Sequence, residues 1–204
     1  MSMSLWYLEE PLVLASKSTV RRQILAAAGI PFDVHPADVD ERTLEQNAGT
    51  ASPTEIALLL AGAKAAAAAA KFPGRLVLAA DQTLACGNRV FAKPADHAAA
   101  REQLAWLRGR THELHAAVAV QCDGVRLFAH CGTARLLMRD FSNSFLEEYL
   151  DLIGATACDS VGAYQLERIG IHLFESVEGD YFTILGLPLL PLLGYFRAAG
   201  YLAA

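Results

Sequence analysis

The hydrophobic pattern at the start of the chain predicts a strand, a polar loop and a helix. Residues 12–15 form a short apolar run, which is typical of a buried strand. Apolar residues then recur at helical intervals over residues 20–28, and Gly29 follows where a helix C-terminus favours a residue with positive φ. A second apolar run at residues 32–35 predicts another strand. Together these segments predict a βα unit.

A strong helix start follows an acidic loop at residues 38–41. Ser52 offers a capping hydroxyl, Pro53 suits the first helical position, and Glu55 can return a carboxylate to the cap. The alanine-rich tract then carries the helix to about Lys71, because alanine is the best helix former. Residues 76–80 predict a buried strand with Asp81 at its C-terminal end.

The second half of the chain predicts a hairpin between helices. The expected elements are a turn at 87–88, a helix at 96–107, strands at 114–120 and 125–138 around Asp123-Gly124, a helix from Ser142 or Ser144 to Ile153, a strand at 171–177, and a closing helix after Pro188. Strands and helices alternate first and a hairpin follows. The pattern therefore predicts an α/β fold with a mixed central sheet flanked by helices.

Composition bounds the class of protein. The 204 residues are 53% hydrophobic and 19% charged, which fits one globular domain over residues 1–204, with one core or two lobes sharing a cleft. The net charge of -5 argues against a protein that coats nucleic acid. The apolar stretches 56–70 and 185–196 contain a lysine and two prolines, so neither predicts a membrane span.

The N-terminal sequence and the cysteine spacing bear on where the protein is located. The N-terminus lacks the pattern of a signal peptide, and the four cysteines show no CxxC spacing. Free thiols in a reducing compartment are the simplest explanation. The sequence therefore predicts a cytoplasmic protein with neither nucleic-acid nor membrane partners.

The loop between the first strand and the first helix is the first candidate site. It holds Ser16, Lys17, Ser18, Arg21 and Arg22. Helix N-terminal N–H groups, hydroxyls and guanidinium groups all favour a bound phosphate, although no Walker-type glycine pattern occurs. The alternative is that a serine only caps the helix and the arginines are solvated.

Single charged residues elsewhere add candidates. Asp81, at a strand end, can hold a metal or accept a proton from water, or it can cap a turn. Glu41 can add a metal-binding oxygen or belong to a solvated loop. Lys64 and Lys93 can each neutralise a phosphate or lie on the surface. His112 can be a ligand or base, or a hydrogen-bonded structural histidine.

These segments together resemble the Maf family of nucleotide pyrophosphatases. The resemblance spans nearly the whole chain and rests on the order and spacing of several motifs. They are LASKSTVRRQIL from Leu14, DVDE from Asp38, Lys64, AADQ from Ala79, KP at Lys93, GRTHEL from Gly109, GAYQLE from Gly162 and EGDYFTILGLPL from Glu178.

The resemblance implies a fold, a reaction and residue roles. It implies an elongated, two-lobed α/β fold related to the inosine-triphosphate pyrophosphatases, with the active-site cleft between the lobes, in a homodimer. The implied reaction is hydrolysis between the α- and β-phosphates with Mg²⁺ or Mn²⁺, in a house-cleaning role. Asp81 matches the proton acceptor and, with Glu41, the metal site. The phosphate-binding positions match Ser16, Arg21, Lys64 and Lys93.

Three positions bear on which nucleobase the substrate would carry. The subgroup acting on thymidine and uridine triphosphates tends to carry Arg, Thr and Gln where this chain has Val20, Gln82 and Glu167. The 7-methyl-GTP subgroup carries an apolar aromatic, Gln and Glu, so two positions match it and Val20 keeps the apolar character. A carboxylate suits the donor groups of a guanine edge. Alternatively, Glu167 pairs with a surface cation such as Arg168.

The sequence leaves other functions open. One alternative is a pyrophosphatase that prefers dTTP or UTP. Another is a non-catalytic nucleotide-binding regulator of cell division, with a phosphomonoesterase as a third. The intact Asp81 and Glu41 favour an enzyme over a binding protein.

Overall fold

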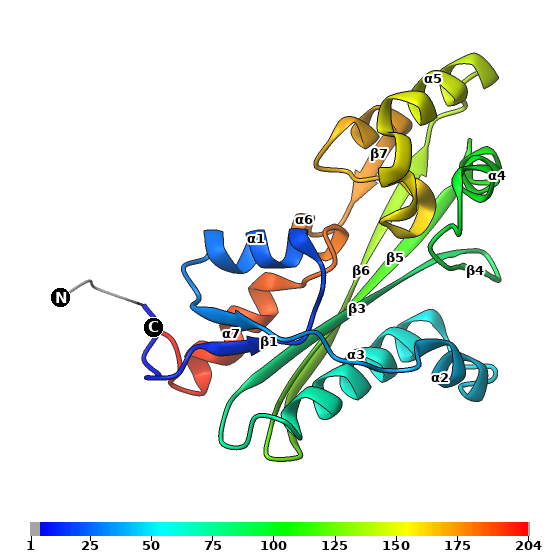
Figure 1. Ribbon diagram of the computed structural model, residues 1–204. Helices are drawn as coiled ribbons and strands as arrows, with labels where there is room; N and C mark the ends of the chain where they lie inside the picture. Colours follow the sequence, from blue (N-terminus) through cyan, green and yellow to red (C-terminus); the bar gives the residue numbers. More distant parts are fainter. Residues whose placement is uncertain (1–4, 204) are drawn as a thin grey trace.

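The computed structural model describes residues 5–203, which fold around one seven-stranded sheet (Figure 1). The strand order is β2-β1-β3-β5-β6-β7, and β4 pairs with β3. The strands are β1 (Leu12–Leu14), β2 (Phe32–Val34), β3 (Val77–Cys86), β4 (Arg89–Phe91), β5 (Thr111–Cys122), β6 (Val125–Met138) and β7 (Phe174–Glu178).

The sheet is mixed, as predicted. β1 is parallel to β2 and to β3, whereas β3, β5, β6 and β7 pair antiparallel in succession. Helices supply the crossovers that parallel strands need. A tight turn joins β5 to β6, where Asp123 and Gly124 have φ values of 47° and 76°. Two consecutive positive φ angles are what a two-residue hairpin turn of this kind requires.

Seven α-helices are described around this sheet. They are α1 (Thr19–Ala27), α2 (Glu41–Asn47), α3 (Pro53–Ala69), α4 (His97–Leu107), α5 (Asn143–Ile153), α6 (Tyr181–Ile184) and α7 (Leu189–Ala198). Short 3₁₀ helices are η1 (Gly154–Cys158), η2 (Val161–Ala163) and η3 (Ile169–Leu173). The expected cap of α3 is present: Ser52 N donates to Glu55 Oε2 at 2.7 Å, and Glu55 N donates to Ser52 Oγ at 3.3 Å.

One face of the sheet is covered by α3 through small side chains. Ala57, Ala61 and Ala65 of the helix form a buried cluster with Ala79 and Ala117 of the sheet. Alanine on both sides lets the helix approach the strands closely. This packing fixes α3, and hence Lys64, relative to β3.

Two further cores give the molecule its two lobes on the other face (Figure 1). The first lobe contains α1 and α7, and its core includes Leu14, Leu78 and Phe196. The second lobe contains α4 and α5 and is built around residues such as Leu104 and Leu136. Because β3, β5 and β6 contribute to both cores, three long strands join the lobes.

Three local predictions were wrong in part. β3 continues to Cys86, so Asp81 lies in the middle of a strand and not at its end. Glu41 opens helix α2, capped by Asp40, whose Oδ1 accepts from Thr43 N at 3.1 Å. Residues 169–173 form a 3₁₀ helix, so the last strand begins only at Phe174. Within residues 5–203, no helix is both long and apolar enough to span a membrane.

Candidate active site

Asp81 lies beside a gap in the strand pairing along one edge of β3. β5 pairs with β3 from Val77 to Ala85 along one edge. On the opposite edge, β1 pairs only at Val77 and Leu78, and β4 pairs only from Leu84 to Cys86. In the described chain no strand covers residues 79–83 on that edge. Asp81 therefore lies in the stretch of β3 that has a neighbouring strand on one edge only.

Lys64 joins two carboxylates beside this gap. Its Nζ lies 2.5 Å from Asp81 Oδ1 and 2.9 Å from Glu41 Oε1. Asp81 is only 6% exposed, whereas Glu41 is half exposed. Burial raises the pKa of Asp81, and the positive charges of Lys64 and Arg21 partly oppose this effect. The structure thus brings together Glu41, Lys64 and Asp81, three of the predicted site residues.

Glu45 belongs to the same acidic group and was not predicted. Burial raises the pKa of Glu45, and the negative charges of Asp81 and Glu41 raise it further. Glu45 lies one turn after Glu41 on α2, and residues four apart share a helix face. The spacing would have indicated Glu45 only if the acidic loop had been recognised as the start of a helix.

Arg21 crosses from α1 to the open edge of β3. Its Nη1 donates to Ala80 O at 2.7 Å and to Ser16 Oγ at 3.3 Å, and its Nε donates to Gly186 O at 2.8 Å. Burial lowers the pKa of Arg21, and the charges of Asp81 and Glu41 oppose that shift. Within residues 5–203, Nη2 has no hydrogen-bond partner. The other two nitrogens of the guanidinium group are thus held by the protein, and Nη2 is not.

The two serines of the loop have separate roles. Ser18 caps α1 by accepting from Arg21 N at 3.3 Å. Ser16 is buried, and its hydroxyl accepts from Ser18 N and from the Arg21 guanidinium, each at 3.3 Å. The capping alternative therefore holds for Ser18, while Ser16 orients Arg21. Lys17 is exposed.

Gln82 faces the opposite side of β3 from Asp81, because successive strand residues alternate. Its Nε2 donates to Thr183 O at 3.1 Å and to Ile184 O at 2.9 Å. Two carbonyl acceptors fix the orientation of the amide, since the reverse orientation would oppose oxygen to oxygen. The Oε1 atom of Gln82 therefore points away from these two carbonyl groups and lies beside Gly186.

The structure does not connect the remaining predicted residues directly to this cluster. Lys93 is exposed after β4, and Glu167 is exposed between η2 and η3. Val20 is half-buried against the core of the first lobe. His112 is 1% exposed, and its Nε2 lies 2.7 Å from the Tyr164 hydroxyl. The structural alternative for His112 is thus confirmed.

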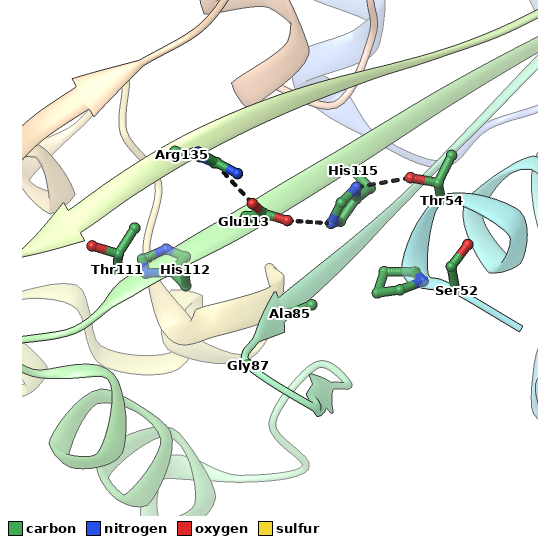
Figure 2. A pocket seen from close by; sticks show the side chains of 10 residues that line it. Ser52, Thr54, Ala85, Gly87, Thr111, His112, Glu113, His115 and Arg135 are labelled. Carbon is green, nitrogen blue, oxygen red and sulfur yellow. Dashed lines mark hydrogen bonds and ion pairs between the residues drawn. The ribbon is translucent and has the colours of Figure 1, made fainter. Parts of the chain in front are cut away.

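A second polar cluster lines a cavity of about 480 Å³ that the sequence did not indicate. Figure 2 shows His115 between Thr54 and Glu113, with Arg135 facing Glu113. The cluster shares the sheet face of Asp81. The first turn of α3 comes between them, because Thr83, two residues beyond Asp81 on β3, donates to Pro53 O at 3.0 Å. The cavity is therefore a neighbour of the site, separated from it by that turn.

The carboxylates fit a divalent cation by their chemistry. The ammonium of Lys64 lies between the two carboxylates and contacts Glu41 Oε1 and Asp81 Oδ1, which leaves the second oxygen of each carboxylate without a contact to Lys64. Over residues 5–203, no three acidic, histidine or cysteine side chains are arranged as a metal-binding group. Two carboxylates with phosphate oxygens as further ligands are the usual arrangement for Mg²⁺.

The fold and the site define an α/β protein with buried carboxylate, ammonium and guanidinium groups at a break in a mixed sheet. Comparison with known proteins then gives the family. The sequence profile described as "Maf-like protein" matches residues 11–199. The chain belongs to the Maf family.

Relatives match along almost their full length. The chain is 56% identical over 201 residues to a nucleoside triphosphate pyrophosphatase of Rhodopseudomonas palustris (strain ATCC BAA-98 / CGA009), covering 98% of this chain and 100% of that protein. It is 49% identical over 192 residues to a 7-methyl-GTP pyrophosphatase of Rhizobium etli, covering 93% and 96%. A solved HAM1 protein from Coxiella burnetii matches 64% of this chain and 74% of its own, with a TM-score of 0.46 and 18% identity.

Proposed function

We propose that this protein hydrolyses nucleoside triphosphates between the α- and β-phosphates, releasing a monophosphate and pyrophosphate. The cluster of Glu41, Lys64 and Asp81 at the gap in β3 is the observation that carries the proposal. The names of the relatives support the same reaction. Cleavage of a phosphate chain depends mainly on positioning and charge neutralisation, which these groups can supply.

In the proposed mechanism Asp81 accepts the proton of the attacking water. Its Oδ1 is held by Lys64, so Oδ2 is available for that proton. Burial raises the pKa of Asp81, which makes its carboxylate a stronger base than an exposed aspartate. The water oxygen bonds to the α-phosphorus, the bond to the bridging oxygen breaks, and pyrophosphate leaves with that oxygen.

Cationic side chains hold the phosphates during this step. Lys64 and the Nη2 group of Arg21 lie beside the gap, and Lys93 would approach from the loop after β4. Ser16 keeps the Arg21 guanidinium in place. Glu41 and Asp81 would bind Mg²⁺ or Mn²⁺, and the ion, when bound, supplies further positive charge to the phosphate chain.

For the base, we propose a guanine-type preference that includes 7-methyl-GTP. The fixed amide of Gln82 offers an acceptor, and the carboxylate of Glu167 offers more. A guanine edge presents N1–H and N2–H₂ donors, whereas uracil and thymine present mainly carbonyl acceptors, which would oppose these oxygens. A preference for dTTP or UTP is the alternative.

The test measures pyrophosphate release from 7-methyl-GTP, GTP, dTTP and UTP with Mg²⁺ or Mn²⁺. Asp81→Asn should lower kcat by at least about a hundredfold, as expected for loss of a general base. Asp151→Asn, at an exposed site on α5, is the matched control and should be unaffected. Full activity of Asp81→Asn contradicts the mechanism.

The same assay separates the other candidate functions. Tight nucleotide binding in calorimetry without turnover would favour a regulatory binding protein, and orthophosphate release would favour a phosphomonoesterase. A clear preference for dTTP or UTP would contradict the proposed guanine-type preference but not the proposed hydrolysis reaction. The homodimer and the cytoplasmic location stay predictions, and sedimentation would measure the first.

A further inference from the structure

The backbone of residues 160–170, which carries Glu167, contains one strained residue, Ala163. Gly162 has φ 79° and Ala163 has φ 59°. A Cβ at Gly162 would lie 2.6 Å from Leu84 Cδ1 and 2.7 Å from Tyr164 Cε1, so any other residue here would displace these side chains and strain the backbone. Ala163 has a Cβ and still adopts the left-handed conformation, which costs free energy. Such a conformation persists only where surrounding contacts enforce it.

Two hydrogen bonds hold this conformation, one of them buried. The Tyr149 hydroxyl donates to Ala163 O at 3.3 Å, and Ser160 Oγ donates to Tyr164 O at 2.5 Å. At the far end Gly170 packs directly on the backbone of Gln165, where a Cβ would collide with the carbonyl oxygen. The segment is therefore held at both ends and in the middle.

His112 connects this segment to the sheet. It lies on β5, opposite Leu136 of β6, and its Nε2 lies 2.7 Å from the Tyr164 hydroxyl. The Phe174 ring packs against both side chains, at centroid distances of 5.9 Å from His112 and 4.8 Å from Tyr164. Since β5 pairs with β6 at this position, the bond ties the segment to the sheet.

We propose that His112 is a positioning residue for substrate discrimination, acting through its buried hydrogen bond to Tyr164. This pair, the His112–Tyr164 clamp, fixes the backbone of residues 161–167 and thereby sets where the Glu167 carboxylate meets the base. The inference rests on the proposed role of Glu167 in reading the base. It assigns His112 a function at a distance, with no contact to the substrate.

Loss of the clamp should affect some nucleotides and spare others, whereas loss of a purely structural bond should affect all of them alike. Tyr164→Phe removes one hydroxyl and keeps the ring, so the core stays filled while the segment gains freedom. A displacement of about 1 Å at a recognition group is enough to change binding strongly. Nucleotides that use Glu167 should therefore lose affinity, and nucleotides that do not use it should be unaffected.

The experiment measures kcat and KM for GTP, 7-methyl-GTP and dTTP in Tyr164→Phe, His112→Phe and the double variant. We expect KM for the guanine-type nucleotides to rise about tenfold, with kcat changed less than about twofold and dTTP unaffected. The double variant should be no worse than either single one, because both remove the same bond. His112→Gln, whose amide can reach the Tyr164 hydroxyl, should restore part of the discrimination.

Two controls separate the possible failures. Tyr195→Phe removes a hydroxyl from a partly buried side chain packed against the core of the first lobe, and its melting temperature and KM together show how lost stability alone affects KM. An equal KM change for all nucleotides, no change, or additive effects in the double variant overturns the clamp. If Glu167→Gln alters discrimination and Tyr164→Phe does not, only the clamp is wrong. If Glu167→Gln has no effect, both the base-reading role and the clamp are wrong.

Discussion

At the scale of single residues, the Lys64 ammonium pairs with the carboxylates of Glu41 and Asp81 at a site with little solvent exposure. The Lys64 side chain is 14% exposed and that of Asp81 is 9% exposed, so solvent screens this contact weakly. Removing one partner leaves the other charge buried without compensation, which is more costly than losing both. The charged groups that would bind phosphate thus also contribute to the free energy of unfolding.

Lys64→Met should therefore destabilise the protein by about 3 kcal/mol at pH 7, because it removes the ion-pair partner of the buried Asp81 carboxylate. Urea unfolding measures the change, and adding Asp81→Asn to Lys64→Met should recover part of the loss. Lys71→Met, at an exposed position beyond α3, is the matched control. Equal effects at Lys64 and Lys71 would show that the ion pair contributes nothing.

His112 gives a second prediction at this scale, for stability against pH. Burial lowers the pKa of His112 from 6.5 to about 4. The unfolded chain then binds more protons between these values, so stability falls as pH drops through this window and levels off below it. Wild type should lose about 3 kcal/mol more than His112→Gln between pH 7 and pH 4. Parallel urea-derived stability curves for the two proteins would contradict the shift.

At the scale of elements, Arg21 and Gln82 attach the turn after α6 to the site. Both side chains bond to backbone carbonyls of residues 183–186, more than 100 positions away along the chain. Gly186 has φ 85°, and a Cβ there would lie 3.3 Å from Arg21 Nη2 and 3.4 Å from Gln82 Oε1. The conformation of this turn and the direction of two site residues are therefore coupled.

Gly186→Ala tests this coupling. Its backbone strain should cost about 1 kcal/mol, and the added methyl group should also displace Arg21 or Gln82 and raise KM. Gly200→Ala is the matched control, since Gly200 has φ 75° and open space around its Cβ position. Both variants should lose stability, and only Gly186→Ala should lose substrate affinity. A KM change of the same size in Gly200→Ala would exclude the coupling.

Local signals explain which elements were predictable. The start of α3 follows from Ser52, Pro53 and Glu55, all within one turn. Helix α2 was missed because its short polar sequence has no apolar period, and Glu45 was missed with it. The contacts of Gln82 and the cluster around His115 depend on partners from distant strands and helices, which no local pattern encodes.

At the scale of the whole molecule, three long strands run through both lobes. β3, β5 and β6 pass through the cores of both lobes. The class of fold was predicted from the alternation of strands and helices, and the mixed sheet is confirmed. The gap in the edge of β3 was not predictable, because it arises from how far β1 and β4 extend along a common neighbour.

Cooperative unfolding follows from these shared strands. The chain has two tryptophans: Trp6 lies in the core of the first lobe and Trp106 packs against that of the second. The single-tryptophan proteins Trp6→Phe and Trp106→Phe should each show fluorescence transitions that coincide with loss of secondary structure in the same protein. Fluorescence midpoints that depart from those transitions would instead indicate lobes that unfold separately.

The position of bond cleavage tests the central claim most directly. GTP is hydrolysed by the wild-type protein in water enriched in heavy oxygen, and the products are separated by mass. Attack on the α-phosphorus, with Asp81 accepting the proton, places the heavy atom in the monophosphate and none in the released pyrophosphate, and Asp81→Asn forms little of either product. Heavy oxygen in pyrophosphate, release of orthophosphate, or undiminished turnover by Asp81→Asn would contradict the account.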